Sequence, residues 1–142
     1  MDDYDSLNHT KWECKYHVVF IPKCRRKLLY DGLRRHLGEM FRALAQQRES
    51  AIEEGHLMPD HVHMLISIPP KYSVAQVIGY IKGKSAIQIA RRYLERPRNF
   101  VGQHFWGRGY FVSTVWRDEK VVREYIKHQE AEDRRLDQLR LW

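Results

Sequence analysis

The segment from His61 to Ile68 constrains the fold more than any other, because its pattern fits a strand that is buried on one face. Alternate side chains of a strand point to opposite sides of the sheet. One side would carry Val62, Met64, Ile66 and Ile68, and the other would carry His61, His63, Leu65 and Ser67. The apolar set must face packed helices, so two imidazoles lie side by side on the opposite face.

The remaining segments predict an alternation of strands and helices around this strand. Period-two patterns indicate strands, and apolar residues three and four apart indicate helices. The predicted strands are Trp12–Phe20, Ser50–His56, His61–Ile68 and Gly109–Val115. The predicted helices are Gly32–Arg48, one that begins at a capping box of Ser73 and Gln76, and one that Asp118 caps and that reaches towards Leu136. A turn at Met58–Asp60 and a loop over residues 97–107 connect them.

This order, β-α-β-β-α-β followed by one more helix, predicts an α+β fold of the ferredoxin-like class, the split βαβ arrangement that RRM domains share. We expect one antiparallel sheet with two helices on one face, which leaves the other face available for a ligand such as single-stranded nucleic acid. The 142 residues are enough for one domain over residues 1–142. Its core would span about residues 11–115, and the extra C-terminal helix about residues 118–138.

Positive charge is concentrated in one part of the chain. The net charge is +7, yet residues 71–128 hold 12 Lys and Arg against 4 Asp and Glu, a local net of +8. Such a concentration suits a phosphate backbone, although a charged run is by default a solvated face.

The sequence carries no sign of export or membrane insertion. The first residues are acidic and polar, and no run of 18 apolar residues occurs. Cys14 and Cys24 stand outside any zinc-binding spacing and are expected to be reduced thiols. We therefore expect a protein that stays in the cytoplasm and has no membrane partner.

Two pairs of residues are candidates for chemistry. His61 and His63 share one strand face, and Tyr125 and Gln129 share one helix face because they are four residues apart. Two imidazoles and an amide oxygen would form a mixed site suited to Mg²⁺ or Mn²⁺ beside a phosphate. Zinc is disfavoured because no thiolate lies near the pair and Asp60 is the only carboxylate to consider as a base. Each pair on its own is more often structural.

Several residues are candidates for contact with DNA. Rings and a cation alternate in the glycine-rich stretch from Phe105 to Phe111, as on a base-stacking surface, although core packing explains the rings equally well. Gly83 lies inside a predicted helix, where glycine is costly, which suggests a close approach by backbone or ligand. The candidate DNA-binding residues are Lys82, Lys84, Arg91, Arg92 and Arg108.

Four blocks of sequence together resemble one family. They are Met58-Pro59-Asp60-His61-Val62-His63-Met64-Leu65-Ile66, Lys82-Gly83-Lys84-Ser85, Arg108-Gly109-Tyr110-Phe111-Val112-Ser113-Thr114-Val115 and Tyr125-Ile126-Lys127-His128-Gln129. In this order and spacing they closely resemble the single-tyrosine HUH transposases of IS-200-like (IS-200/605 type) bacterial insertion sequences. The match runs from about Lys11 to Gln129.

The resemblance implies a metal-dependent endonuclease and strand transferase that acts on single-stranded DNA, binds hairpins near the ends of its element, and uses no nucleotide cofactor. His61 and His63 would be the histidines of the HUH motif, with Gln129 as the third metal ligand. Tyr125 would be the nucleophile that forms a 5′-phosphotyrosine bond. The family acts as a homodimer in which the tyrosine helix of one subunit commonly completes the metal site of the other.

One residue departs from the family pattern, and two alternative functions stay open. Trp116 occupies a position after the fourth strand where the family usually has a glycine that serves as a hinge. A domesticated or REP-associated relative would cut hairpin DNA without moving its own gene. A catalytically silent RRM-like module would bind nucleic acid without forming a covalent adduct.

Overall fold

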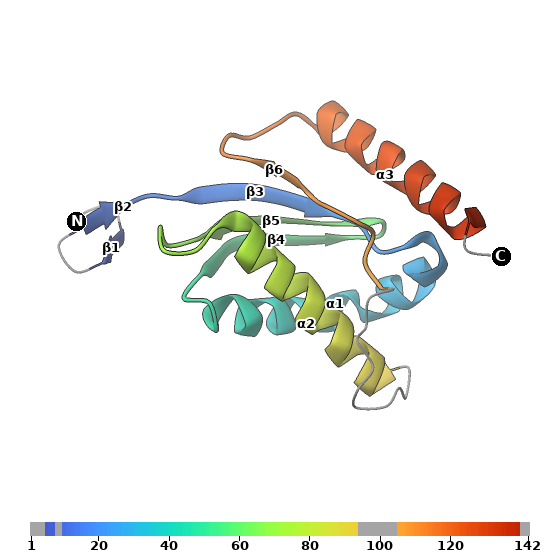
Figure 1. The fold of residues 1–142 in the computed structure, drawn as a ribbon, viewed down its shortest axis with the longest axis horizontal. Helices are drawn as coiled ribbons and strands as arrows, with labels where there is room; N and C mark the ends of the chain where they lie inside the picture. The colour runs from blue at the N-terminus through green and yellow to red at the C-terminus, as the bar shows by residue number, and fades with distance from the viewer. Residues whose placement is uncertain (1–4, 8–9, 94–104, 140–142) are drawn as a thin grey trace.

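The structure of the protein is a computed structural model that describes residues 5–7, 10–93 and 105–139. Its elements are β1 (Asp5–Leu7), β2 (Thr10–Trp12), β3 (Lys15–Phe20), a 3₁₀ turn η1 (Cys24–Arg26), α1 (Lys27–Gln46), β4 (Ala51–Met58), β5 (His61–Ser67), α2 (Val74–Tyr93), β6 (Phe111–Ser113) and α3 (Glu119–Leu139). β1 and β2 form a separate two-stranded sheet at the N-terminal end (Figure 1).

The main sheet confirms the predicted fold class. Its strand order is β4-β5-β3-β6, and every neighbouring pair is antiparallel. This is the order that a split βαβ chain produces, with the two strands that follow a helix placed at the edges. β5 lies between β3 and β4, so hydrogen bonds to both neighbouring strands fix its backbone and the direction of its side chains.

The hydrophobic core lies between the sheet and the two helices α1 and α2, which cover the same face (Figure 1). The alternate residues Val62, Met64 and Ile66 of β5 are almost fully buried in this core, as the sequence pattern predicts. β3 contributes Val18 and Phe20 to the same face. The other side chains of these two strands must therefore point to the opposite face of the sheet.

The opposite face is not left open, which corrects the expectation that helices would cover one face only. α3 lies across it (Figure 1) and packs Val122 and Ile126 against Val19 and Ile21. The apolar stripe of α3 would otherwise face water, so the helix folds back onto the sheet and buries it. Asp118 caps α3 by accepting a hydrogen bond from the Val121 amide at 3.0 Å, as predicted.

Several boundaries differ from those predicted. The first predicted strand is interrupted: Trp12 pairs with Asp5 in the β1–β2 hairpin, and the strand of the main sheet begins only at Lys15. α1 begins earlier than Gly32, at Lys27, because Tyr30 is buried and its hydroxyl is anchored by hydrogen bonds. β6 is shorter than predicted. Residues 97–104 of the predicted loop lie outside the described residues.

The connection that leads from α2 to β6 is anchored on α2 by two residues of the Lys-Gly-Lys-Ser block. The Lys82 ammonium donates hydrogen bonds to the carbonyls of Gly107 and Gly109, at 2.9 and 2.6 Å. Ser85 accepts a hydrogen bond from the Trp106 indole at 2.9 Å. Gly109 has a φ of 74°, a conformation that favours glycine.

Among the helices of the described ranges, none is long and apolar enough to cross a membrane.

Two glycine substitutions are expected to have opposite effects on stability. A Cβ atom on Gly107 would lie 2.9 Å from Cγ1 of the buried Ile21, so Gly107→Ala should lower the free energy of unfolding by about 1–3 kcal/mol.

A Cβ atom on Gly83 in the helix α2 would meet nothing within 4 Å. Gly83→Ala should therefore raise the free energy of unfolding by about 0.5–1 kcal/mol.

Urea denaturation of both variants measures these changes. A Gly83→Ala variant that is less stable than the parent would show that a described neighbour does approach this glycine, contrary to the structure.

Candidate active site and nucleic-acid interface

The two histidines of β5 line one surface pocket on the face of the sheet that carries α3. The pocket is lined by His56, Met58, His61, His63, Trp116, Arg117, Glu119, Val122 and Arg123. These residues come from β4 and its end, β5, the β6–α3 connection and the first turns of α3. The face of the sheet predicted for the histidines is therefore correct, and it forms a pocket because α3 closes one side.

His61 is held in place by its neighbour Asp60. The His61 side chain is almost fully buried, and its Nδ1 lies 2.7 Å from Oδ1 of Asp60. The Arg123 guanidinium donates a hydrogen bond to the other carboxylate oxygen of Asp60 at 2.6 Å. Two successive hydrogen bonds, from His61 to Asp60 and from Arg123 to Asp60, therefore connect strand β5 to α3.

The ionisation state of Asp60 decides which ring nitrogen of His61 forms the hydrogen bond to it. Burial acts to raise the pKa of Asp60, but the hydrogen bonds from His61 and Arg123 outweigh burial and hold the pKa below its usual value. An ionised carboxylate only accepts hydrogen bonds, so His61 donates one to Asp60 from Nδ1, and Nε2 is the ring nitrogen that Asp60 leaves unengaged. A carboxylate behind a histidine in this way is the usual support of a metal-binding imidazole.

The backbone at the start of β5 is fixed by a buried hydroxyl. The hydroxyl of Tyr30 in α1 donates a hydrogen bond shared by the carbonyls of His61 and Met58, at 2.7 and 2.5 Å. These contacts hold the turn between β4 and β5, which places Asp60 and His61. The position of the histidine pair thus depends on α1, on the far side of the sheet.

His63 is half-buried among other imidazoles. His56 lies directly opposite it on β4, with ring centroids 6.2 Å apart, and His17 of β3 lies at 5.7 Å. Burial, together with the neighbouring His17, His61 and His56, lowers the pKa of His63 to about 4. The ring is therefore neutral near pH 7, which is the form that binds metal ions.

Trp116 stacks on His63. The ring centroids are 5.3 Å apart and the planes are inclined by 21°, and the indole also meets His17 edge-on at 5.2 Å. The predicted hinge residue thus belongs to the wall of the histidine pocket. Its role as a hinge stays a prediction.

Tyr125 lies on α3 outside this pocket. Its ring packs beside Phe111 with centroids 5.6 Å apart, in the small cluster between α3 and the sheet. The hydroxyl is buried and has no hydrogen-bond partner among the described residues. Burial raises the pKa of Tyr125 to about 12. The phenol is protonated and enclosed, so in this arrangement it is not positioned to attack a phosphate.

Gln129 is also not brought to the histidines within one chain. The pocket is lined by the first turns of α3, up to Arg123, and Gln129 lies six residues further along, about 9 Å along the helix axis. Metal–ligand bonds to oxygen are only about 2.0–2.6 Å long. The structure therefore places His61 and His63 together in the pocket, whereas Tyr125 and Gln129 are not among the residues that line it.

The donor set in the pocket fits a partial metal site. His63 offers a neutral imidazole, and His61 offers an imidazole whose Nδ1 is held by Asp60. In the part of the chain that the structure describes, no three His, Cys, Asp or Glu side chains are grouped so that they could hold a metal ion. A metal ion held here would need a further ligand, such as an amide oxygen.

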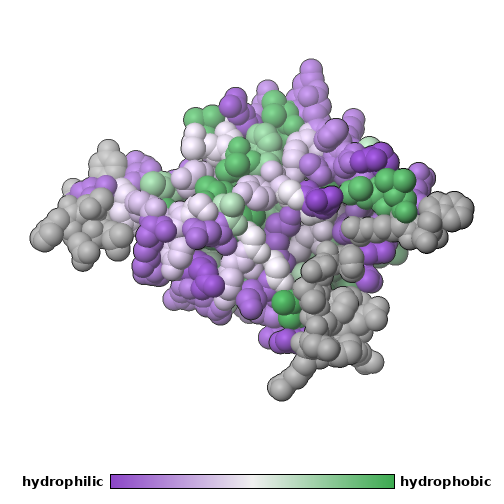
Figure 2. Space-filling view, in the orientation of Figure 1, coloured by the Kyte–Doolittle hydropathy of each residue, from purple (hydrophilic) through white to green (hydrophobic). Residues whose placement is uncertain are grey.

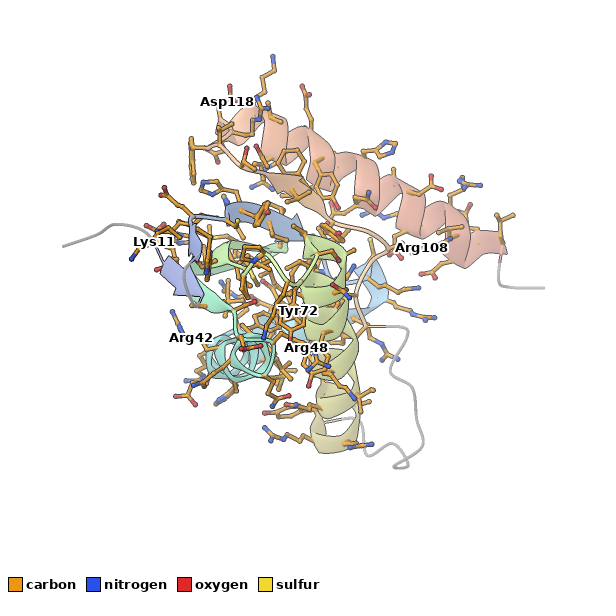
Figure 3. All side chains as sticks on the ribbon, turned by 60° about the vertical axis from the view of Figure 1, so that its left-hand side comes forward. Lys11, Arg42, Arg48, Tyr72, Arg108 and Asp118 are labelled. Atoms are coloured by element: carbon orange, nitrogen blue, oxygen red, sulfur yellow. The ribbon has the colours of Figure 1, made fainter. Side chains whose placement is uncertain are left out.

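The predicted DNA-binding residues lie on the other side of the sheet, on and near α2. A groove there is lined by Gly79, Tyr80, Lys82, Gly83, Lys84, Ala86, Ile87, Trp106, Gly107 and Arg108. Lys82 is committed to the backbone of the connection, whereas Lys84 and Arg108 are exposed. Arg91 and Arg92 are exposed in the last turn of α2. Figure 3 shows Arg108 well separated from Asp118 at the start of α3.

The suspected close approach at Gly83 is not made by any described part of the chain. A Cβ atom there, or on Gly79 one turn earlier, would meet nothing within 4 Å. The two glycines therefore line the groove together with Lys84 and Arg108, and no described residue contacts them closely.

Sequence reasoning missed three residues that surround the histidine pair, of which His56 and Arg123 line the pocket and His17 contacts His63. His17 and His56 belong to neighbouring strands, and the register that places them beside His63 is set by strand pairing, which no local pattern reveals. Arg123 was missed because its partner Asp60 lies far away in the sequence. The only hint in the sequence was that His17 occupies one of the polar positions in the alternating pattern of its strand.

Comparisons with known proteins agree on one family. The family model "Transposase IS200 like" matches residues 10–129. The chain is 42% identical over 139 residues to the transposase for insertion sequence element IS200 of Salmonella typhimurium, covering 98% of this chain and 91% of that protein. It is 26% identical over 119 residues to the ISDra2 transposase TnpA of Deinococcus radiodurans, covering 83% and 85%.

Two solved structures resemble the fold. A crystal structure of a Deinococcus radiodurans protein assigned as a transposase has a TM-score of 0.73 and 25% identity, covering 88% of this chain and 97% of that one. A REP-associated tyrosine transposase bound to a REP hairpin has a TM-score of 0.52 and 14% identity, covering 91% and 70%. The second likeness concerns the fold alone.

The lowered pKa of His63 predicts a loss of stability in acid. The unfolded chain protonates this side chain near pH 6.5 and the folded chain only near pH 4. Between these values the unfolded state binds more protons, so the free energy of unfolding falls as the pH falls through this window. His63→Gln should lack this part of the dependence. Urea denaturation in EDTA at pH 7, 6 and 5 compares the two, and parallel pH profiles would contradict the assignment.

Proposed function

Because this chain belongs to the IS200-like transposase family, we propose that it cleaves and rejoins single-stranded DNA at the ends of an insertion sequence, with Tyr125 as the nucleophile. The observation that carries the proposal is the pocket in which Asp60 orients His61 beside a neutral His63. The high coverage of the IS200 relatives favours a mobile-element transposase over the REP-associated alternative.

The residues of the pocket support a metal-assisted reaction. We propose that His61, His63 and Gln129 hold Mg²⁺ or Mn²⁺ next to the scissile phosphate. Such an ion, when bound, polarises the phosphate and stabilises the charge that develops on it. Asp60 and Arg123 act on His61 rather than on the DNA, because they keep its Nε2 directed away from the carboxylate.

The chemical steps need no nucleotide cofactor. The Tyr125 hydroxyl gives up its proton as its oxygen attacks the phosphorus, the bond to the 3′ oxygen breaks, and that oxygen takes up a proton, so that a free 3′-hydroxyl is left. The 5′ side stays bound to the protein as a phosphotyrosine. A 3′-hydroxyl later attacks this phosphorus, restores a phosphodiester and releases the tyrosine, so the energy of the original bond is conserved.

The position of α3 favours completion of the site by a second copy of the chain. In the single chain, Tyr125 is enclosed against Phe111 and Gln129 lies about 9 Å along α3 from the pocket wall. Both residues share one helix face, so one displacement of α3 would deliver them together. We propose a homodimer in which α3 of one subunit supplies them to the histidines of the other.

Hairpin DNA is the proposed partner of the groove beside α2. Lys84 and Arg108 border an open floor formed by Gly79 and Gly83, where a phosphate backbone could approach the helix closely. The REP-associated neighbour of the same fold was solved with a DNA hairpin, which is consistent with this partner. Arg91 and Arg92 extend the positive surface along α2.

Substitution of the nucleophile should abolish covalent chemistry and spare binding. Single-stranded DNA from both flanks of the gene is incubated with the protein in Mg²⁺ or in EDTA, and products are resolved on denaturing gels and by mass. The parent should form an adduct at Tyr125 only with the metal, whereas Tyr125→Phe should form none and bind the DNA with nearly unchanged affinity. DNA binding without an adduct in any metal would favour the catalytically silent RRM-like module.

A mixture of two inactive variants tests the composite site. His63→Ala lacks a metal ligand and Tyr125→Phe lacks the nucleophile, so each should be inactive alone. Mixed after subunit exchange, they should regain adduct formation, because the histidines of one subunit meet the tyrosine of the other. A mixture that stays as inactive as its components would show that α3 serves the histidines of its own chain.

A further inference from the structure

The strongest unexplained feature of the histidine pocket is a large apolar ring left in water at its rim. Trp116 is 63% exposed although it stacks on His63. Apolar surface patches interrupt the hydrophilic surface over the region of β6 and the start of α3 (Figure 2). An exposed indole contributes little to folding, and exposed aromatic rings beside cations are characteristic of surfaces that bind single-stranded nucleic acid.

We propose that Trp116 is a stacking platform for one unpaired base of the DNA, next to the candidate active site. This inference rests on the proposed function, because it names how the same pocket holds its substrate. The contact would be independent of base identity, since every base has a π-face.

The orientation of the indole is set by two histidine rings of the sheet. Its centroid lies 5.3 Å from that of His63 in a nearly parallel arrangement and 5.2 Å from that of His17 in a perpendicular one. These are preferred geometries of aromatic pairs. A ring that is already oriented loses little freedom when a base stacks on its outer surface, so binding there costs less entropy.

The stack is compatible with a ligand role for His63. The lone pair of an imidazole nitrogen lies in the plane of the ring, whereas Trp116 covers the face of the ring. The indole therefore leaves the nitrogen edge of His63 accessible. A base on the outer side of Trp116 would extend a continuous stack that begins at His63, which places the neighbouring phosphate close to the histidine pair.

The charges around the pocket suit a nucleotide. Arg117 follows Trp116 in the chain, is exposed and lines the pocket, and Arg123 lines it while bonded to Asp60. Glu119 is the acidic side chain among the lining residues. Arg117 is the cation best placed to attract the phosphate next to a stacked base.

The test combines a change in the protein with a change in the DNA: the indole is removed from the protein, and the bases are removed from the probe. The probes are a fluorescein-labelled dT 15-mer and a 15-mer of abasic nucleotides with the same backbone, and binding is measured by anisotropy in EDTA at one salt concentration. Trp116→Ala should weaken binding of the dT 15-mer by roughly 5- to 150-fold, the range found when a stacking residue is replaced by alanine, and should leave binding of the abasic 15-mer nearly unchanged. Trp116→Phe should retain most of the affinity for the dT 15-mer.

Leu28→Ala is the control, because Leu28 is an exposed apolar residue of α1, outside both the histidine pocket and the groove beside α2, and this variant should bind both probes like the parent. Equal affinities of the parent and Trp116→Ala for the dT 15-mer, or equal losses on both probes, would overturn the platform while the Tyr125 adduct could still form. A parent that binds no single-stranded DNA would overturn the proposed function itself. Thermal unfolding confirms that each variant is folded.

Discussion

The antiparallel pairing of β5 with β3 on one side and β4 on the other is the constraint on which the rest of the structure depends. It commits Val62, Met64 and Ile66 to the core beneath α1 and α2. The same alternation turns His61 and His63 to the opposite face. A shift of the register by one residue would bury the imidazoles in the core and expose the apolar set, so the hydrophobic effect that stabilises the sheet also positions the histidines.

α3 affects both the histidine pocket and the Tyr125 hydroxyl. Its first turns close the histidine pocket, and Arg123 reaches Asp60 behind His61. Its first two turns also bury Val122 and Ile126 on the sheet and enclose the Tyr125 hydroxyl. The single chain thus holds a formed histidine pair and a shielded Tyr125 hydroxyl, so the proposed reaction would require α3 to move.

The basic and the histidine-bearing surfaces are separated by the sheet. Lys84 and Arg108 lie with α2 on the core side, whereas the histidines lie with α3. The two surfaces are tied together by the Lys-Gly-Lys-Ser block, whose Lys82 and Ser85 fasten the connection that leads to β6. A residue that resembles a DNA contact in the sequence can therefore be a structural anchor, because a cation is also a donor for backbone carbonyls.

The sequence by itself determined the order of the four main-sheet strands and the three α-helices, the fold class, and the face of β5 that carries His61 and His63, because these follow from local periodicity. It also determined the family, through four blocks of residues in a fixed order. Only the tertiary structure decided that α3 covers the second face, that Asp60 and Arg123 orient His61, and that Trp116 stacks on His63. These contacts join residues far apart in the chain, and the burial and strand register that create them arise from packing, which no local pattern encodes.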